Sequence, residues 1–225
     1  MKLAIVGVGK MGRMIEQLAP GQGFELWARI DADDSIDAAA GADVAMEFSV
    51  PGAAARNIER LVALGVPVVC GTTGWSADLP RVRAAVEAKG GALVYSANFS
   101  IGVNVFTRVA AEASRLLAGE TEYGAWAWEI HHAAKKDAPS GTLLALVDAM
   151  RAAGFARPID VSSSRAGTVP GTHEIGFDSA ADTITLRHVA RSREGFARGA
   201  LKAAQWVIGK RGVWTFSDVL FGRTG

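Results

Sequence analysis

Short apolar runs alternate with amphipathic segments through the first hundred residues. The apolar runs predict strands at residues 3–6, 25–30, 44–48, 66–70 and 93–95. Apolar positions at helical spacing predict helices at residues 11–18, 53–64 and 79–88. Strands separated by helices predict βαβ units and a parallel sheet. Because the strand runs are apolar without alternation, we expect helices to cover both faces of this sheet.

The pattern changes from about residue 103. Residues 103–117 form one longer amphipathic segment that predicts a helix, and residues 123–131 resemble a strand with its aromatic side chains on one parity. A helix is then expected at 142–153, strands at 159–163, 174–177 and 183–188, and a last helix at 196–208, which ends at residues 209–212 before a short tail. Strands clustered around helices indicate a mixed or antiparallel sheet.

Composition narrows the class of protein. The chain has 225 residues, 49% hydrophobic and 21% charged, so it can bury a sizeable core. With a net charge of +1 and no concentrated basic patch, we expect neither a nucleic-acid nor a membrane partner. The single cysteine, Cys70, excludes an intramolecular disulfide and is expected to be a small buried core residue. No apolar stretch reaches the about 18 residues of a membrane span, and the N-terminal apolar run is too short for a signal peptide, so a soluble, cytoplasmic protein is expected.

A glycine-rich turn directly follows the first predicted strand and opens the first helix. Its residues Gly7, Val8, Gly9, Lys10, Met11 and Gly12 fit the pattern G-x-G-x-x-G. The first glycine permits a tight turn, the second lets the backbone approach a pyrophosphate, and the third allows close packing of helix on strand. Asp31 ends the second strand, about 20 residues further on, where a carboxylate can bind ribose hydroxyls. Lys10 either meets a 2′-phosphate or is simply solvated, and the sequence favours neither.

Two further turns are expected at the same edge of the sheet. The strand at 66–70 is followed by Gly71, Thr72 and Thr73. The strand at 93–95 is followed by Ser96, Ala97, Asn98 and Phe99. Ligands of open α/β sheets bind beyond the carboxyl ends of the strands, so both turns are placed to line the nicotinamide side of a dinucleotide site. The alternative is that they are ordinary turns from strand to helix.

A second group of candidate residues lies at 131–142. His131 and His132 end a predicted strand and so point to opposite faces unless the strand breaks there, and Lys135 follows. Ser140, Gly141 and Thr142 resemble a helix start, whose N–H groups and hydroxyls suit a carboxylate. Histidine can transfer protons near neutral pH. The alternative is a capped helix beside incidental surface histidines.

The same region also contains residues that bind other classes of ligand. The His-His pair suggests zinc, but no third ligand stands at a metal-site spacing, so no metal is expected. Arg165, Arg191 and Arg193 are further candidates for anion contacts, because arginine binds carboxylates bidentately.

The stretch 129–142, Glu-Ile-His-His-Ala-Ala-Lys-Lys-Asp-Ala-Pro-Ser-Gly-Thr, resembles the signature of the dihydrodipicolinate reductase family. Blocks at 71–74, 98–104, 170–173 and 192–200 match the family in the same order. The resemblance implies reduction of a cyclic imino dicarboxylate, 4-hydroxy-tetrahydrodipicolinate, to tetrahydrodipicolinate in the diaminopimelate pathway of lysine biosynthesis, with hydride from NADH and/or NADPH. It implies His131 as the acid/base residue and Lys135 as the proton donor, with His132, Lys135, Ser140, Gly141 and Thr142 binding the substrate and residues 7–12, Asp31, 71–73 and 96–99 holding the cofactor.

The resemblance also bears on organisation. It implies a Rossmann-like nucleotide domain at residues 1–102 plus 194–225, since the last helix of the family returns to that domain. Residues 103–193 then form an α+β domain for substrate binding and for assembly of a homotetramer through its sheet. Family members often have one more residue in the first glycine loop and an arginine where Ala32 stands here, which leaves the choice between NADH and NADPH open. The chain is also short, with trimmed connections after Asp31 and around residues 176–183.

Two other functions remain open from the residues alone. A related reductase or amine dehydrogenase could act on another small substrate, although Lys135 and the 140–142 turn favour a carboxylated one. A nucleotide-sensing domain is the non-catalytic alternative, but a sensor does not need both His131 and Lys135.

Overall fold

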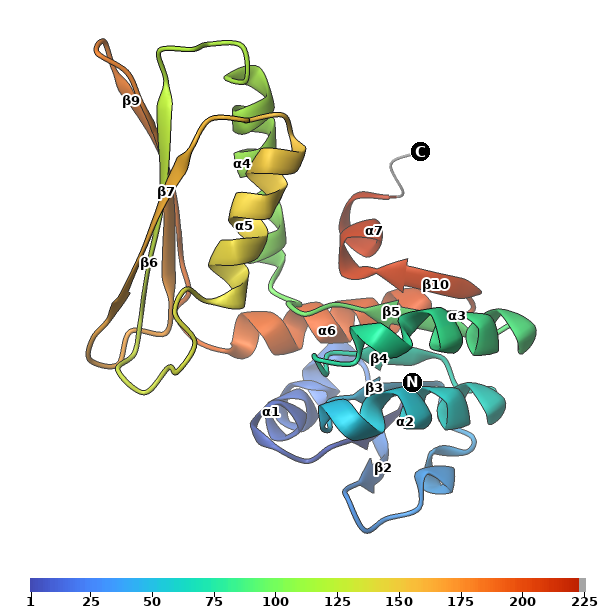
Figure 1. Ribbon diagram of the computed structural model, residues 1–225. Coiled ribbons are helices and arrows are strands. Elements are labelled where there is room, and N and C mark those ends of the chain that lie inside the picture. The colour runs from blue at the N-terminus through green and yellow to red at the C-terminus, as the bar shows by residue number, and fades with distance from the viewer. Residues whose placement is uncertain (223–225) are drawn as a thin grey trace. The chain divides into compact units, whose positions relative to one another are not determined.

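The computed structural model describes residues 1–222, which form two compact units (Figure 1). The first unit comprises Met1–Ser100 and the chain from Glu194 onward, and the second comprises Ile101–Arg193. The chain therefore leaves the first unit after Ser100 and returns to it at Glu194. Each unit has its own sheet and its own core.

The first unit contains a six-stranded sheet whose strands are all parallel. Its strands are β1 (Lys2–Val6), β2 (Glu25–Ile30), β3 (Val44–Glu47), β4 (Val68–Cys70), β5 (Ala92–Tyr95) and β10 (Gly212–Thr215), in the order β10-β5-β4-β3-β1-β2. Parallel strands need crossover connections, and helices supply them here. The expected Rossmann-like parallel sheet is confirmed.

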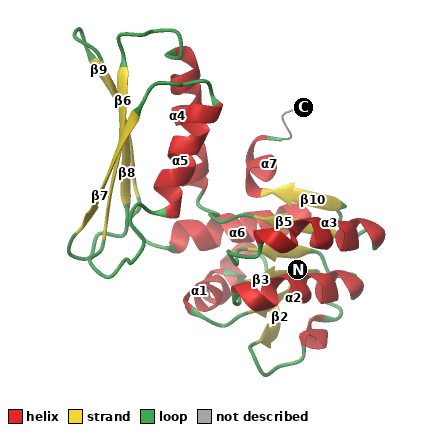
Figure 2. Cartoon of the chain, viewed as in Figure 1, coloured by secondary structure: helices red, strands yellow, loops and turns green. Residues whose placement is uncertain are grey.

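Helices cover both faces of this sheet, as Figure 2 shows in red against the yellow strands. Helices α2 (Pro51–Ala63) and α3 (Leu79–Ala88) contribute to the core on one face, and α1 (Lys10–Leu18) and α6 (Glu194–Val207) to the core on the other. The inner strands are almost fully buried, as their unbroken apolar runs predict. The edge strand β2 is mostly exposed because it has a neighbour on one side only, and Trp27 there is 45% exposed.

The expectation of a short tail after residue 212 is wrong. Residues 212–215 form strand β10, which pairs with β5 at the edge of the sheet, and Phe216–Phe221 forms helix α7. Two local features stabilise this end. Thr215 and Asp218 make a reciprocal capping box at the start of α7. The buried ring of Phe216 packs against Phe99, with ring centroids 4.9 Å apart.

The second unit is built on a four-stranded mixed sheet, as expected. Its strands are β6 (Gly124–His131), β7 (Ile159–Arg165), β8 (Thr172–Asp178) and β9 (Thr183–Val189), in the order β7-β6-β8-β9. Strands β6 and β7 are parallel, and the other pairs are antiparallel. Helices α4 (Ile101–Leu116) and α5 (Gly141–Ala152) cover one face and close a core of aliphatic and phenylalanine side chains (Figure 1).

The other face of this sheet carries no helix of its own unit (Figure 1). Along β6 the residues alternate, so that Trp126, Trp128 and Ile130 are half-buried on the open face. The indole of Trp126 lies over Gly176 of β8, where any Cβ would collide with the ring. Two large aromatic side chains are thus ordered on a sheet face that the unit itself leaves uncovered.

Candidate active site

The glycine turn after β1 borders a cavity of about 360 Å³ in the first unit. Its lining comes from the carboxyl ends of β1, β2 and β3 and from the start of α2: Val6, Gly7, Val8, Gly9, Ile30, Asp31, Ala32, Asp34, Ile36, Phe48, Ser49, Val50, Ala53 and Asn57. This is the edge where ligands of open α/β sheets bind. The sequence predicts Gly7, Val8, Gly9 and Asp31 at this place, and they lie there together.

Each glycine of the turn has a distinct steric reason. Gly7 has φ +90°, and a Cβ there would collide with the backbone carbonyl of Phe48. A Cβ at Gly12 would collide with the carbonyl oxygen of Gly7, so the third glycine allows helix α1 to pack closely. Gly9 is different, since nothing lies within 4 Å of the space a Cβ would take. The open space at Gly9 and the N-terminus of α1 directly after it fit a pyrophosphate.

The far end of the cavity is acidic. Asp31 and Asp34 both line it, and the Asp31 N–H donates to Oδ2 of Asp34 over 2.8 Å, which closes a tight turn after β2. Lys10 is exposed at the start of α1 and is not among the lining residues, and Ala32 contributes no charge. The sequence reasoning missed Asp34, although the run Asp-Ala-Asp-Asp at 31–34 contains the signal.

A buried carboxylate holds two polar side chains of the cavity wall in place. Glu47, at the end of β3, is fully buried and accepts hydrogen bonds from Ser49 and from the Asn57 amide, the latter over 3.3 Å. Ser49 and Asn57 both line the cavity, so Glu47 fixes two polar groups that face it. Cys70 also donates to Glu47, and burial raises the pKa of its thiol, so the expected inert core cysteine is confirmed.

The two later turns border a second cavity of about 260 Å³. Thr72, Thr73, Ser96 and Ala97 line it, as the sequence predicts, together with Gly74, Trp75, Ser76, Leu79 and Tyr95. The Trp75 indole N–H donates to the carbonyl of Thr72 over 2.8 Å, which shapes one wall. The hydroxyl of Thr72 is buried without a hydrogen-bond partner among the described residues. An unsatisfied buried hydroxyl at a cavity wall fits a polar ligand group.

The remaining predicted cofactor residues support these cavities instead of lining them. Met11 packs into the core between α1 and the sheet, and Phe99 is buried there. The side chain of Asn98 accepts from the N–H of Ser100 over 2.8 Å. A Cβ at Gly71 would collide with the ring of Phe48, so this glycine lets Phe48 reach the cavity wall. Core packing by Met11 and Phe99, the Asn98 hydrogen bond and the small size of Gly71 therefore support the cavity walls.

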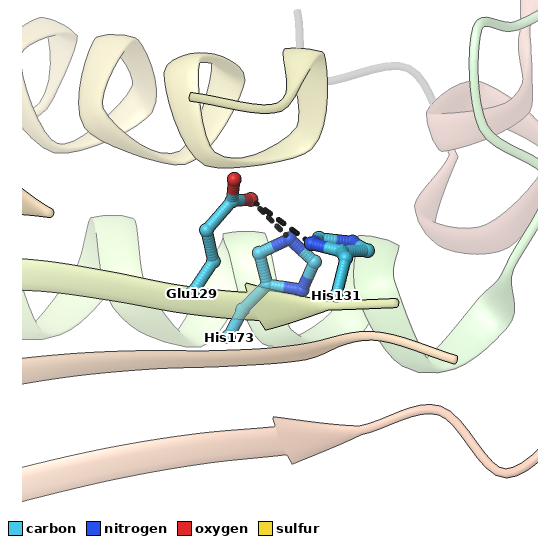
Figure 3. Close-up of side chains that lie close together, drawn as sticks. All are labelled: Glu129, His131 and His173. Carbon is cyan, nitrogen blue, oxygen red and sulfur yellow. Dashed lines mark ion pairs between the residues drawn. The ribbon is translucent and has the colours of Figure 1, made fainter. Parts of the chain in front are cut away.

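The second unit holds a compact polar cluster on the covered face of its sheet (Figure 3). Glu129 and His131 are two residues apart on β6 and point to the same face, while His173 comes from β8. The carboxylate Oε2 of Glu129 lies 3.6 Å from Nδ1 of His131 and 3.3 Å from Nε2 of His173. All three residues are buried. Arg165 of β7 places its guanidinium 2.8 Å from Oε1 of the same carboxylate.

The strand ends between the two histidines, which resolves the expected conflict over their directions. His131 is the last residue of β6, and His132 is half-buried in the loop that follows. Gly171 leaves room for the His131 ring, since a Cβ at Gly171 would lie 2.9 Å from Nε2.

The loop from 132 to 140 ends at a capped helix start. The side chain of Ser140 accepts from the N–H of Leu143 over 3.2 Å, so Ser140 is the N-cap of α5, as the sequence predicts. Half-buried Lys135 donates to both carboxylate oxygens of Asp137, over 2.8 and 3.0 Å. The pKa of Asp137 is lowered, mainly by this lysine and in smaller part by backbone N–H groups, including that of Gly141.

Burial and charge set the protonation of the cluster. Burial would raise the pKa of Glu129, but hydrogen bonds from Ser140 and Arg165 outweigh it, so its pKa lies below the usual value. Burial lowers the pKa of His131, against the opposing effect of Glu129. Burial also lowers the pKa of His173 to about 4, helped by the nearby His131. At neutral pH the cluster therefore holds an ionised carboxylate and neutral histidines.

Glu129, His131 and His173 could geometrically hold a metal ion, because one donor atom of each lies within 4.8 Å of the others. The carboxylate is already engaged, however. It accepts from Ser140, from Ser163 and from the cationic Arg165. The positive charge that a metal would supply is thus provided by the guanidinium, and these residues fit a proton-handling site better than a metal centre. Of the arginine candidates, Arg165 contacts a carboxylate of its own chain, and Arg191 and Arg193 are exposed.

None of the described helices is long and apolar enough to cross a membrane.

Comparisons with known proteins agree over nearly the whole chain. Residues 1–99 match the sequence model of the dihydrodipicolinate reductase N-terminus, and residues 102–220 match that of the C-terminus. The chain is 36% identical to the 4-hydroxy-tetrahydrodipicolinate reductase of Christiangramia forsetii over 98% of both chains. It is 33% identical to the protein of the same name from Thermosipho africanus, again over 98% of both.

Solved structures show the same fold. A dipicolinate-bound dihydrodipicolinate reductase from Paenisporosarcina sp. TG-14 superposes with a TM-score of 0.85 at 20% identity, over 96% of this chain and 97% of that one. An amine dehydrogenase from Mycobacterium smegmatis reaches a TM-score of 0.59 at 12% identity, over 96% and 95% of the two chains, which reflects shared architecture alone. With both halves matched by family models and relatives above 30% identity over nearly its full length, the chain belongs to the dihydrodipicolinate reductase family.

Proposed function

We propose that this protein reduces 4-hydroxy-tetrahydrodipicolinate to tetrahydrodipicolinate, the step of the diaminopimelate pathway of lysine biosynthesis for which its relatives are named. The nicotinamide nucleotide supplies the hydride. The observation that carries the proposal is the pairing, in one chain, of a glycine-turn cavity in the first unit with a histidine, lysine and helix N-terminus cluster in the second. The first unit binds the nucleotide, and the second binds the substrate.

The nucleotide is held by backbone and small side chains. Gly7, Gly9 and the first turn of α1 cradle the pyrophosphate, and Asp31 binds ribose hydroxyls. Thr72, Thr73, Ser96 and Ala97 line the wall for the nicotinamide, where the Thr72 hydroxyl offers a hydrogen bond. These roles rest on the match to the family and on the two cavities.

Asp137 supports the assignment of the substrate-binding groups. Its carboxylate accepts two hydrogen bonds from Lys135, and its pKa is lowered mainly by this lysine and in smaller part by the backbone N–H of Gly141. Lys135 and Gly141 are two of the groups expected to bind a substrate carboxylate. An anion of the right chemistry therefore already fits between the lysine and the start of α5. A substrate carboxylate takes the place of Asp137, with Thr142 and His132 at the margin of the same site.

Binding of dipicolinate tests this function without turnover. Dipicolinate is a planar ring with two carboxylates, and it is the ligand named for the Paenisporosarcina relative. We expect titration calorimetry to detect dipicolinate binding in the presence of nucleotide, and picolinate, which has one carboxylate fewer, to bind at least about tenfold more weakly, because each charge-assisted contact contributes about 1.5–3 kcal/mol. Equal affinity for the two acids would contradict a dicarboxylate site.

The acidic end of the first cavity favours NADH over NADPH. A 2′-phosphate there would meet Asp31 and Asp34, and no lysine or arginine is among the lining residues within the described range 1–222. Two like charges about 4 Å apart repel by about 1 kcal/mol in water and about 4 kcal/mol near a protein surface, and 1.4 kcal/mol is a factor of ten. We therefore expect kcat/KM to favour NADH by at least about tenfold, with Lys10 solvated.

Three substitutions test this preference. Asp34→Ala should lower the NADH/NADPH ratio of kcat/KM, because it removes one repelling charge. Asp33→Ala is the matched control, since Asp33 lies in the same exposed turn but does not line the cavity. Lys10→Ala should leave the ratio unchanged. A wild-type preference for NADPH that is lost in Lys10→Ala would instead assign the 2′-phosphate to that lysine.

We propose that the protein is a cytoplasmic homotetramer, as the family resemblance implies. The open face of the second sheet supports this assembly. Trp126 and Trp128 are half-buried there, and aromatic side chains are enriched at protein interfaces. Light scattering during gel filtration should give about four times the 23.5 kDa of one chain. Trp126→Arg should reduce this mass, whereas Trp27→Arg, at an exposed edge of the first unit, should not. A wild-type mass of one chain would refute the assembly.

A further inference from the structure

Glu129 has more partners than a residue that merely fills the core would need. It is fully buried, and its two oxygens accept from the Ser140 N–H over 2.8 Å, from the Ser140 hydroxyl, from Ser163 over 3.2 Å and from Arg165 over 2.8 Å. His131 and His173 face the same carboxylate (Figure 3). A buried carboxylate with this many donors stays ionised and rigid.

These contacts hold the substrate-binding loop at both ends. At its start, Glu129 is two residues from His131 on the same strand. At its end, the carboxylate binds both polar groups of Ser140, the residue that caps α5. Arg165 connects Glu129 to the middle of this loop, because the same guanidinium nitrogen donates to the Glu129 carboxylate and to the backbone carbonyl of Asp137. The direction of the α5 N-terminus and the path of the loop before it therefore depend on one side chain.

The carboxylate also orients the imidazole of His131. Nδ1 is buried, faces Oε2 of Glu129 at 3.6 Å and has no hydrogen-bond partner among the described residues, while Nε2 lies on the other side of the ring beside Gly171. A carboxylate on the Nδ1 side favours a proton on Nδ1 and leaves Nε2 to exchange the catalytic proton. The other charged or titratable groups that act on His131 are Lys135 and Asp137 of the loop, Arg165 of β7 and His173 of β8.

We propose that Glu129 is the positioning residue of the substrate half of the site, fixing the tautomer of His131 and the N-terminus of α5 through one buried charge. The proposal rests on the proposed function for the meaning of the site. The substitution Glu129→Gln keeps the size of the side chain but removes the charge and places an amide N–H against donors. It should therefore disturb His131 and the loop without touching the nucleotide.

The test compares Glu129→Gln with Glu112→Gln, an exposed glutamate on α4 of the same unit, away from both the cluster and the open sheet face. In Glu129→Gln we expect kcat to fall by about 10–100-fold, the size typical of a lost orienting partner, with the affinity for NADH unchanged. The His131 resonance, followed by NMR against pH, should titrate at lower pH because a favourable negative charge is gone. Restored titration and partial activity in Glu129→Asp would confirm that the charge matters. Glu112→Gln should resemble the wild type.

A second variant separates the two effects of Glu129. Ser140→Ala leaves the carboxylate charged and keeps the backbone N–H bond to it, but removes the hydroxyl that joins Glu129 to the N-cap of α5. It should therefore weaken dipicolinate binding and raise KM while the His131 titration stays in place. If Glu129→Gln does not fold, Ser140→Ala still tests the tie to the helix and Glu129→Asp the charge. Unchanged His131 titration and kcat in a folded Glu129→Gln would overturn the proposal. The NMR result needs no turnover, so it is separable from a failure of the proposed function.

Discussion

His131→Gln should lower kcat by about 10²–10⁴-fold, the usual contribution of a general acid, while the affinity for NADH stays near that of the wild type. The histidine lies in the second unit at the end of β6, whereas the nucleotide cavity is built from β1, β2, β3 and α2 in the first. Glutamine retains a polar side chain of similar length but cannot transfer a proton. Stopped-flow turnover together with fluorescence titration of NADH measures the two quantities separately. A loss of NADH affinity as large as the loss of turnover would contradict the assignment.

The pH dependence gives a second measurement on the same residue. Burial lowers the pKa of His131 below its ordinary value near 6.5, so the substrate-free protein holds it neutral at pH 7. If the protonated imidazole is the acid, kcat/KM falls as pH rises through this lowered pKa. The decrease should disappear in His131→Gln, since the group that titrates is gone. A decrease that persists unchanged in the variant would show that another group titrates.

Lys135→Ala should raise KM and lower kcat together, each by about 10–100-fold, because a charge-assisted hydrogen bond contributes about 1.5–3 kcal/mol and each 1.4 kcal/mol is tenfold. Lys135 is the cation that binds the carboxylate of Asp137 bidentately, and the proposed reaction uses it both to bind a substrate carboxylate and to donate a proton. Steady-state kinetics with NADH saturating, and calorimetry with dipicolinate, report the two roles.

Lys136 provides a matched control for this substitution. It is the next residue, carries the same charge and is exposed. Lys136→Ala should therefore leave kcat, KM and dipicolinate affinity near the wild-type values. Equal losses in the two variants would mean that the net charge of the loop matters and not a specific contact of Lys135.

The sequence predicts most of the fold because the signals are local. Strand β2 and helix α3 begin and end at the predicted residues, since apolar runs and helical periodicity depend only on neighbours in the chain. Strand β10 was missed for the opposite reason. Its four residues form a strand by pairing with β5, more than a hundred positions earlier, and nothing in Gly-Val-Trp-Thr alone indicates that partner.

The candidate site also contains some residues that local motifs predict and others that depend on long-range strand pairing. Gly7, Gly9 and the Ser140 cap follow from short motifs, and the structure places them at a cavity and at a helix start. The cluster around Glu129 depends on strand register, which sets Glu129 opposite Ser163 on one side and His173 on the other. Sequence spacing cannot supply that register. The parity of Glu129 and His131 along β6 was the one available signal.

The central claim is tested most directly by turnover of the proposed substrate. The upstream synthase generates 4-hydroxy-tetrahydrodipicolinate in situ, and the absorbance of the reduced nicotinamide is followed with NADH and NADPH in parallel reactions. We predict oxidation that requires both the synthase and this protein, is faster with NADH, and is nearly abolished in His131→Gln. If neither nucleotide is oxidised while the synthase product accumulates, the proposed function is wrong.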